Sequence, residues 1–192
     1  MSFNFKHLTE QVRALMLDEV DLDEKSGEMY TGKTTNLAGK AAFAGLLKAA
    51  IKDGNEVTLG LSLHPGLFLQ KSPRSNGRGG TVMASVPSDA NQTLAEGEFN
   101  RFYIRAVCRL ALDQGCPEVE IYRARRSENP RPESQRLLGK QIDASSLLND
   151  LRNSQGVDTA LGCPPGPRSG LSVMLPTAFV AAIADRHALS QA

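Results

Sequence analysis

The sequence contains no tryptophan, and aromatic residues make up 5% of its 192 residues. A core must therefore rely on Leu, Ala, Val and Ile. No apolar run approaches the roughly 18 residues that a membrane-spanning helix requires, so we expect no membrane segment. Residues 1–19 alternate polar and apolar side chains and include Asp18 and Glu19, so we also expect no secretory signal peptide.

The sequence also lacks a strong net charge. Its 22 Lys and Arg residues against 21 Asp and Glu residues give a formal charge of +1. No global field therefore draws the chain toward nucleic acid or a membrane, and any such binding must come from local patches. A hydrophobic fraction of 41% is ordinary for a globular protein, and the length predicts a single domain over residues 1–192.

Residues that carry catalysis or bind metals do not form recognisable motifs. Three cysteines, an odd number without C-x-x-C spacing, favour reduced thiols in the cytoplasm. They are Cys108, Cys116 and Cys163. Whether Cys116 and Cys163 pair is left open. His7, His64 and His187 lack metal-ligand spacing. We therefore predict no catalytic residue, cofactor or metal, and favour a protein that is not an enzyme.

The strongest pattern lies between Glu98 and Gln114. Its apolar residues follow the i, i+3, i+4, i+7 spacing of one helix face. They are Phe99, Phe102, Tyr103, Ala106, Val107, Leu110 and Ala111. Gly115 suits the residue that ends such a helix. On a flanking stripe, Arg101, Arg105 and Arg109 fall four apart, and we predict that they face outward toward a partner.

The rest of the chain predicts a mixture of helices and strands. Helices are expected over 5–24 (with Thr9 as a candidate N-cap), after Asn36 to about Asp53, from Asp143 (a candidate N-cap) to about Asn153, and over 177–189. Strands are expected over 56–63, 81–86, 118–125 and 170–175.

The connections are equally informative. Residues 71–80 predict an exposed loop, 126–140 an irregular connection and 162–167 a rigid turn. Because helices and strands do not alternate regularly, the order favours an α+β fold with a mixed or antiparallel sheet packed by helices. We expect mobile arms near 64–80 and 126–140.

One stretch matches a nucleotide-binding motif. Residues Gly27–Thr34 fit the G-x-x-x-x-G-K-[ST] phosphate loop, with Lys33 as its lysine. Such a loop needs a buried strand before it and a helix directly after the lysine. Residues 21–26 are acidic instead, and the next expected helix begins only at Asn36. A turn between two helices is favoured, and a nucleotide-binding enzyme acting through this loop is the alternative.

Two groups of basic residues are candidates for partner contacts. The first is Lys71, Arg74 and Arg78; the second is Arg123, Arg125 and Arg126, followed by Arg131, Arg136 and Lys140. Flexible arginines of this kind can contact phosphate backbones. No aromatic stacking set is interleaved with them, as single-strand binders usually require. A solvated face or a protein–protein contact is favoured over a small nucleic-acid-binding or regulatory protein.

Three passages carry a resemblance to a group of proteins. They are residues 17–30 leading into 46–50, Glu98–Arg105, and Gly166–Val173. Together they resemble uncharacterised proteins encoded by tailed bacteriophages and prophages. The resemblance implies no mechanism and transfers no site residue.

With that resemblance, the leading hypothesis is a virion structural protein. A head-associated role fits best, as a decoration, capsid-stabilising or assembly component made in the bacterial cytoplasm. The near-zero net charge, the missing active-site motifs and the expected arms favour it. Its partners would be other virion or capsid proteins, or further copies of this chain in an oligomer or lattice. Nucleic acid is a less favoured partner, and no membrane is expected.

Overall fold

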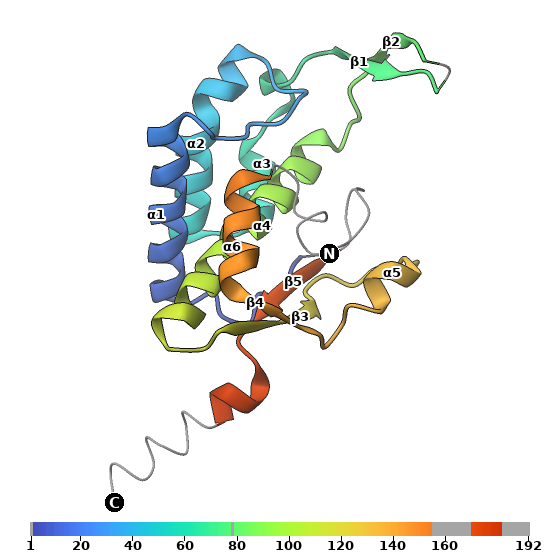
Figure 1. Cartoon of the computed structure of the whole chain (residues 1–192). Helices are drawn as coiled ribbons and strands as arrows, with labels where there is room; N and C mark the ends of the chain where they lie inside the picture. The colour runs from blue at the N-terminus through green and yellow to red at the C-terminus, as the bar shows by residue number, and fades with distance from the viewer. Residues whose placement is uncertain (1, 78, 155–169, 182–192) are drawn as a thin grey trace, which may run out of the picture. The chain divides into compact units, whose positions relative to one another are not determined.

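Helices and two small antiparallel sheets make up this chain, which has an α+β fold (Figure 1). The computed structural model describes residues 2–77, 79–154 and 170–181. The chain divides into two compact units: unit 1 is Met1–Glu19 with Asn100–Ala192, and unit 2 is Val20–Phe99. Helices α1 (Glu10–Ser26) and α4 (Ala90–Asp113) contribute residues to both.

Unit 1 contains a three-stranded sheet of order β4-β3-β5. The central strand β3 (Glu118–Arg123) pairs antiparallel with β4 (Gln141–Asp143) and with β5 (Leu171–Met174). Val119 and Ile121 are buried on one face of β3, as the period-2 alternation predicts. The antiparallel sheet and both predicted strands, over 118–125 and 170–175, are therefore confirmed with slightly shorter bounds.

Helix α6 (Ala144–Asn153) begins where the sequence indicates. The Asp143 carboxylate accepts a hydrogen bond from the Ser146 N–H at 2.7 Å, which confirms Asp143 as the N-cap. The helix buries Leu147, Leu148 and Leu151. The preceding connection, predicted to be irregular, contains one short helix, α5 (Pro132–Gln135).

Hydrogen bonds tie the N-terminal residues to β3 and to Ala124, which follows it. The Asn4 N–H donates to the Ala124 carbonyl at 2.7 Å, and the Lys6 N–H donates to the Tyr122 hydroxyl at 3.2 Å. These bonds hold residues 4–7 out of a helix, so the helix predicted over 5–24 starts only at Glu10. Thr9 does accept from the Val12 N–H at 3.3 Å, which confirms it as the cap.

Helix α4 extends the predicted Glu98–Gln114 helix toward its N-terminus and starts at Ala90. Gly115, with φ of 75°, follows its end as expected. The predicted apolar face is buried, with Phe99, Phe102 and Tyr103 fully inaccessible to solvent. The helix therefore belongs to the core, as its spacing indicates.

Helix α2 (Leu37–Asp53) belongs to unit 2 and confirms the second predicted helix. The Asn36 side chain accepts from the Gly39 N–H at 2.9 Å and caps it. Phe43, Leu47 and Ile51 are fully buried. A short 3₁₀ helix, η1 (Pro65–Leu67), contacts α2 near its start.

The strand predicted over 56–63 is wrong: these residues form helix α3 (Glu56–Ser62). Asn55 starts the helix with a capping box, because its side chain accepts from the N–H groups of Val57 and Thr58 while the Thr58 hydroxyl accepts from the Asn55 N–H. Leu59 and Leu63 are buried one turn apart. The alternating leucines thus satisfied the i, i+4 spacing of a helix as well as the period of a strand.

The loop predicted over 71–80 is also wrong in part. Strand β1 (Lys71–Ser75) pairs with β2 (Thr81–Ser85) in a two-stranded antiparallel hairpin, and β2 is close to the strand predicted over 81–86 (Figure 1). Between the strands, Gly77 and Gly79 have φ of 72° and 81°, a backbone conformation that favours glycine. The exposure predicted for this segment is confirmed, since four of the five β1 residues are exposed.

Two predicted elements lie wholly or partly outside the residues that the structure describes. The turn over 162–167 lies outside the described residues. Of the helix predicted over 177–189, residues 177–181 are helical, and the remainder lies outside the described residues.

Candidate functional site

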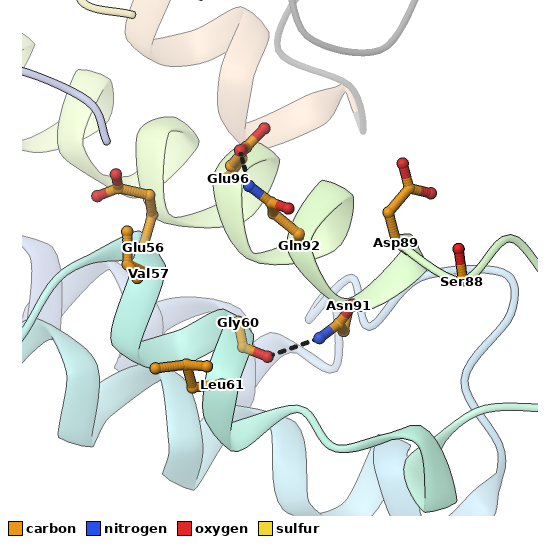
Figure 2. A pocket seen from close by; sticks show the side chains of 9 residues that line it. All are labelled: Glu56, Val57, Gly60, Leu61, Ser88, Asp89, Asn91, Gln92 and Glu96. Carbon is orange, nitrogen blue, oxygen red and sulfur yellow. Dashed lines mark hydrogen bonds between the residues drawn. The ribbon is translucent and has the colours of Figure 1, made fainter. Parts of the chain in front are cut away.

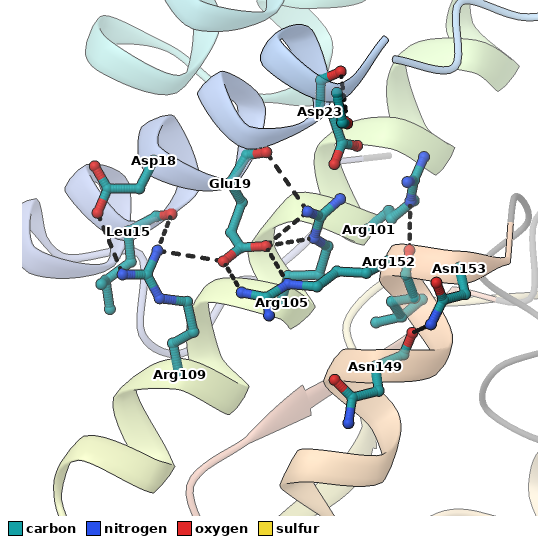
Figure 3. A network of polar contacts seen from close by, with 12 residues as sticks. Leu15, Asp18, Glu19, Asp23, Arg101, Arg105, Arg109, Asn149, Arg152 and Asn153 are labelled. Atoms are coloured by element: carbon teal, nitrogen blue, oxygen red, sulfur yellow. Dashed lines mark hydrogen bonds and ion pairs between the residues drawn. The ribbon is translucent and has the colours of Figure 1, made fainter. Parts of the chain in front are cut away.

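The arginine stripe of α4 lies in a buried ion network (Figure 3). We predicted that its members face outward, but the side chains of Arg101 and Arg105 are buried, with residue exposures of 1% and 0%. The prediction is therefore wrong for both residues. Arg109 keeps a side-chain exposure of 26% at the edge of the network.

Glu19 of α1 is the centre of this network, and three guanidinium groups converge on its carboxylate. Its Oε2 accepts from Arg105 Nε at 2.8 Å and from Arg152 Nε at 3.0 Å. Its Oε1 accepts from Arg152 Nη2 at 2.5 Å and from Arg109 Nη1 at 3.2 Å. Burial alone raises the pKa of Glu19, but the bonds and charges of Arg152 and Arg105 outweigh it, so the pKa lies below its ordinary value.

One feature of the sequence indicates that Glu19 is buried and paired. Glu19 occupies the last position of an otherwise apolar stripe on the first helix, where a carboxylate is buried only if it is paired. Arg152, on α6, was missed because nothing local ties it to Glu19. Arg101 has a related structural role, donating from Nε to the Leu151 carbonyl at 3.1 Å. The stripe therefore stabilises unit 1.

The second basic group is only partly exposed. Arg123 donates to the Ser134 hydroxyl at 3.2 Å, and the Arg125 guanidinium lies 5.5 Å from the centre of the Phe3 ring. Both side chains are thus engaged within unit 1, while Arg126 is exposed. Of the first group, Lys71 and Arg74 are exposed on the hairpin, and Arg78 lies outside the described residues.

The segment Gly27–Thr34 lies between two helices, as the favoured interpretation predicted. Helix α1 ends at Ser26, immediately before the segment, where a phosphate loop would follow a buried strand. Helix α2 begins only at Leu37. The Thr35 hydroxyl closes the turn by donating to the Thr31 and Gly32 carbonyls, each at 2.8 Å. The strand–loop–helix context of a nucleotide site is therefore not present here.

A cavity of about 270 Å³ lies in unit 2, between α3 and the first turns of α4 (Figure 2). Three carboxylates, Glu56, Asp89 and Glu96, line it together with amide, hydroxyl and aliphatic groups. The amide of Gln92 donates to Glu96 at 2.9 Å, and that of Asn91 donates to the Gly60 carbonyl at 2.9 Å. The lining contains no histidine, cysteine or lysine. Its polar side chains are therefore the three carboxylates, the amides of Asn91 and Gln92 and the Ser88 hydroxyl.

Thiols and imidazoles do not assemble into a reactive centre in the described part of the chain. Cys108 and Cys116 are buried free thiols. Burial, followed by the charges of Asp143 and Glu19, raises the pKa of Cys108, so its thiol stays protonated. Cys163 and His187 lie outside the described residues. Across the residues that are described, no group of side chains could hold a metal ion, and no helix is long and apolar enough to cross a membrane.

The β1–β2 hairpin combines exposed apolar side chains with exposed basic ones. Val82 and Met83 on β2 are 48% and 62% exposed, although they are apolar. Lys71 and Arg74 on β1 are exposed beside them. No Asp or Glu occurs between Val57 and Ser88, so the hairpin is basic and apolar without a compensating acid in its own sequence.

Comparisons of the chain with models of protein families, with curated proteins and with solved structures found no match.

Proposed function

We propose that this protein is a bacteriophage virion structural protein, a head-associated decoration, capsid-stabilising or assembly component that acts through protein–protein contacts. The observation that carries the proposal is the exposed β1–β2 hairpin. The assignment to a virion rests on the sequence resemblance, and the hairpin supplies the contact surface that such a role needs.

An isolated two-stranded hairpin is marginally stable in water, and it usually needs a third strand or a packed face. Within the described residues this sheet has only its two strands. It also leaves Val82 and Met83 in contact with solvent. Both features favour a hairpin that completes its hydrogen bonds and covers its apolar side chains against another chain.

The buried Glu19 network supports the same role, because it shows which arginines are not available to a partner. It occupies the arginines that could otherwise have served as an anion site in unit 1 and uses them for packing. The hairpin, in contrast, keeps basic and apolar side chains exposed for contact. A protein that binds through such a segment needs no catalytic centre.

The proposal is tested on purified phage particles made by a host that carries the gene. We expect the wild-type protein in the particles by mass spectrometry, and we expect Val82→Ser with Met83→Ser to lower its incorporation. Leu37→Ser is the matched control, since Leu37 is an exposed apolar residue of unit 2 outside the hairpin, 85% exposed. A protein absent from the particles contradicts the proposal.

A second pair of variants tests the nucleic-acid alternative. That alternative predicts DNA or RNA binding that falls steeply with salt and is lost in Lys71→Ala with Arg74→Ala. Incorporation into particles that is unaffected by this pair but lowered by the Val82 and Met83 changes supports the contact role.

A further inference from the structure

The two outer edges of the hairpin differ chemically. Two cross-strand hydrogen bonds determine which residues direct their backbone groups to the partner strand and which direct them outward. The Val86 N–H donates to the Gln70 carbonyl at 3.0 Å, and the Asn76 N–H donates to the Gly80 carbonyl at 3.0 Å. Because hydrogen-bonded pairs alternate in an antiparallel ladder, Ser72/Ala84 and Arg74/Val82 are the bonded pairs between them. The remaining residues of each strand direct their backbone groups outward.

The outer edge of β1 is blocked. Its outward residues are Lys71, Pro73 and Ser75. Pro73, at the middle of the strand, has no N–H to donate, and Lys71 adds an exposed charge. Proline and lysine on an edge strand are the devices by which proteins prevent pairing with another chain.

The outer edge of β2 carries no such protection. Its outward residues are Thr81, Met83 and Ser85, each of which has an N–H and a C=O. None of the five β2 residues is charged, and none is proline. In the described part of the chain no other strand pairs with this edge. The edge is therefore a complete template for one further strand.

We propose that β2 pairs antiparallel with β2 of a second copy of this chain, giving a sheet of order β1-β2-β2-β1 across a two-fold axis. The inference rests on the proposed function, since it names the partner that the hairpin contacts. Centring the pair on Met83 places Thr81 opposite Ser85 of the second copy, so all three outward residues of each strand find bonding partners. Val82 then faces Ala84 across the strands, and the two Met83 side chains cover each other.

The positions of the charged residues and the blocked β1 edges favour a dimer over a sheet that continues through further copies. The basic residues Lys71 and Arg74 lie on the outer strands of the four-stranded sheet, so the two copies do not bring like charges together at the axis. The same blocked β1 edges then end the sheet on both sides. An isologous contact of this kind closes at two copies.

A disulfide tests the register. Residues at the centre of a hydrogen-bonded antiparallel pair have Cα atoms about 5.5 Å apart, within the range of a disulfide. Under mild oxidation we expect Met83→Cys to form a covalent dimer on non-reducing gels. Val82→Cys is the matched control, because position 82 faces Ala84 and the two introduced cysteines would lie about 7–8 Å apart on the diagonal. Equal cross-linking of both variants, or none at residue 83, overturns the proposed register.

The mass in solution tests the dimer itself. We expect light scattering to give twice the 20.7 kDa chain mass for the wild type, and a single-chain mass for Met83→Lys, which places two ammonium groups at the axis. Arg74→Lys is the control, since it keeps the charge on the blocked strand. Circular dichroism confirms that each variant folds. A wild type that stays monomeric at all concentrations overturns the inference.

The two proposals fail in different ways. If the protein is a monomer but is still incorporated into particles, the β2–β2 contact is wrong and the virion role stands with another partner. If the protein is a dimer but is absent from particles, the β2–β2 contact stands and the virion role is wrong.

Discussion

Glu19 is a buried carboxylate held by guanidinium groups from α4 and α6. Its removal leaves Arg105, whose side chain is fully buried, without its bonded carboxylate. We predict that Glu19→Gln lowers the free energy of unfolding by about 3–5 kcal/mol, the usual cost of breaking a buried ion pair from one side. Urea denaturation followed by circular dichroism measures it.

Asp18 is the matched control for Glu19. It pairs with Arg109 Nη2 at 3.3 Å, but its side chain is 60% exposed. Exposed pairs contribute about 1 kcal/mol or less, so Asp18→Asn should change the unfolding free energy by no more than that. If Glu19→Gln costs as little as Asp18→Asn, the network does not have the structural role assigned to it.

His7 links the N-terminal segment to Leu175, directly after β5, and we expect it to make the stability of unit 1 depend on pH. Its Nε2 accepts from the Leu175 N–H at 3.2 Å, which requires that nitrogen to be unprotonated. Burial, with a smaller effect from the charge of Lys6, lowers the pKa of His7 below its ordinary value of about 6.5.

The folded state therefore binds this proton less readily than the unfolded chain. The stabilisation is fully present above pH 6.5 and is lost as the pH falls through the folded-state pKa. We predict a lower free energy of unfolding at about pH 5.5 than at about pH 7.5, measured in urea. His7→Gln should reduce that difference; an unchanged difference in the variant would assign the pH dependence to other groups.

At the scale of single elements, α2 contains two glycines with opposite roles. A Cβ at Gly39 would lie 2.2 Å from the Leu67 carbonyl oxygen, so the absent side chain lets η1 approach the helix. A Cβ at Gly45 would meet nothing within 4 Å. Both positions cost helix propensity relative to Ala, but only Gly39 is required by packing.

We predict that Gly45→Ala stabilises the protein by roughly 0.5–1 kcal/mol and that Gly39→Ala destabilises it despite the same gain in propensity. Each is the control for the other, and thermal unfolding compares them. Stabilisation by both would show that α2 can move away from Leu67 at little cost.

What the sequence could predict about the elements depended on whether the deciding contacts were local. The start of α2 after Asn36, the cap at Asp143 and the helix end at Gly115 were predicted, because each is decided within one turn of its own helix. Helix α3 was mistaken for a strand, since Leu59 and Leu63 fit both periods and only the cap at Asn55 distinguishes them.

The candidate site was predicted only in part, for a related reason. The exposed, basic character of the segment around Lys71 and Arg74 followed from its composition. Its strand structure did not, because the Gly-, Ser- and Pro-rich residues gain that conformation from pairing with 81–85. The burial of Arg101 and Arg105 likewise depended on groups distant in sequence, including Glu19, which lies 86 residues before Arg105.

At the scale of the whole molecule, the two units differ in how the chain builds them. Unit 2 is one continuous stretch, whereas unit 1 joins the first 19 residues to the part of the chain after Phe99. Its contacts therefore span long separations, up to the 168 residues between His7 and Leu175. Contacts of that range form slowly, because a long loop must close before they contribute. We expect unit 1 to depend on its N-terminal segment.

Deleting residues 2–8 tests this dependence. The deletion removes the Asn4 bond to Ala124 and the Lys6 bond to Tyr122, each worth about 1 kcal/mol. It also removes the ring of Phe5, which lies 4.5 Å from that of Tyr103 and contributes about 0.5–1.5 kcal/mol beyond its buried area. We predict a loss of about 3 kcal/mol in urea denaturation. Amide hydrogen exchange should also become faster across β3.

Lys6→Ala is the control for that deletion, because the Lys6 side chain is exposed and its backbone bond persists. It should leave both stability and the exchange of β3 unchanged. If the deletion behaves like Lys6→Ala, then the residues after Phe99 complete the sheet of unit 1 by themselves. The N-terminal segment would then pack against the sheet without being needed for it, because β3 would keep its pairing with β4 and β5.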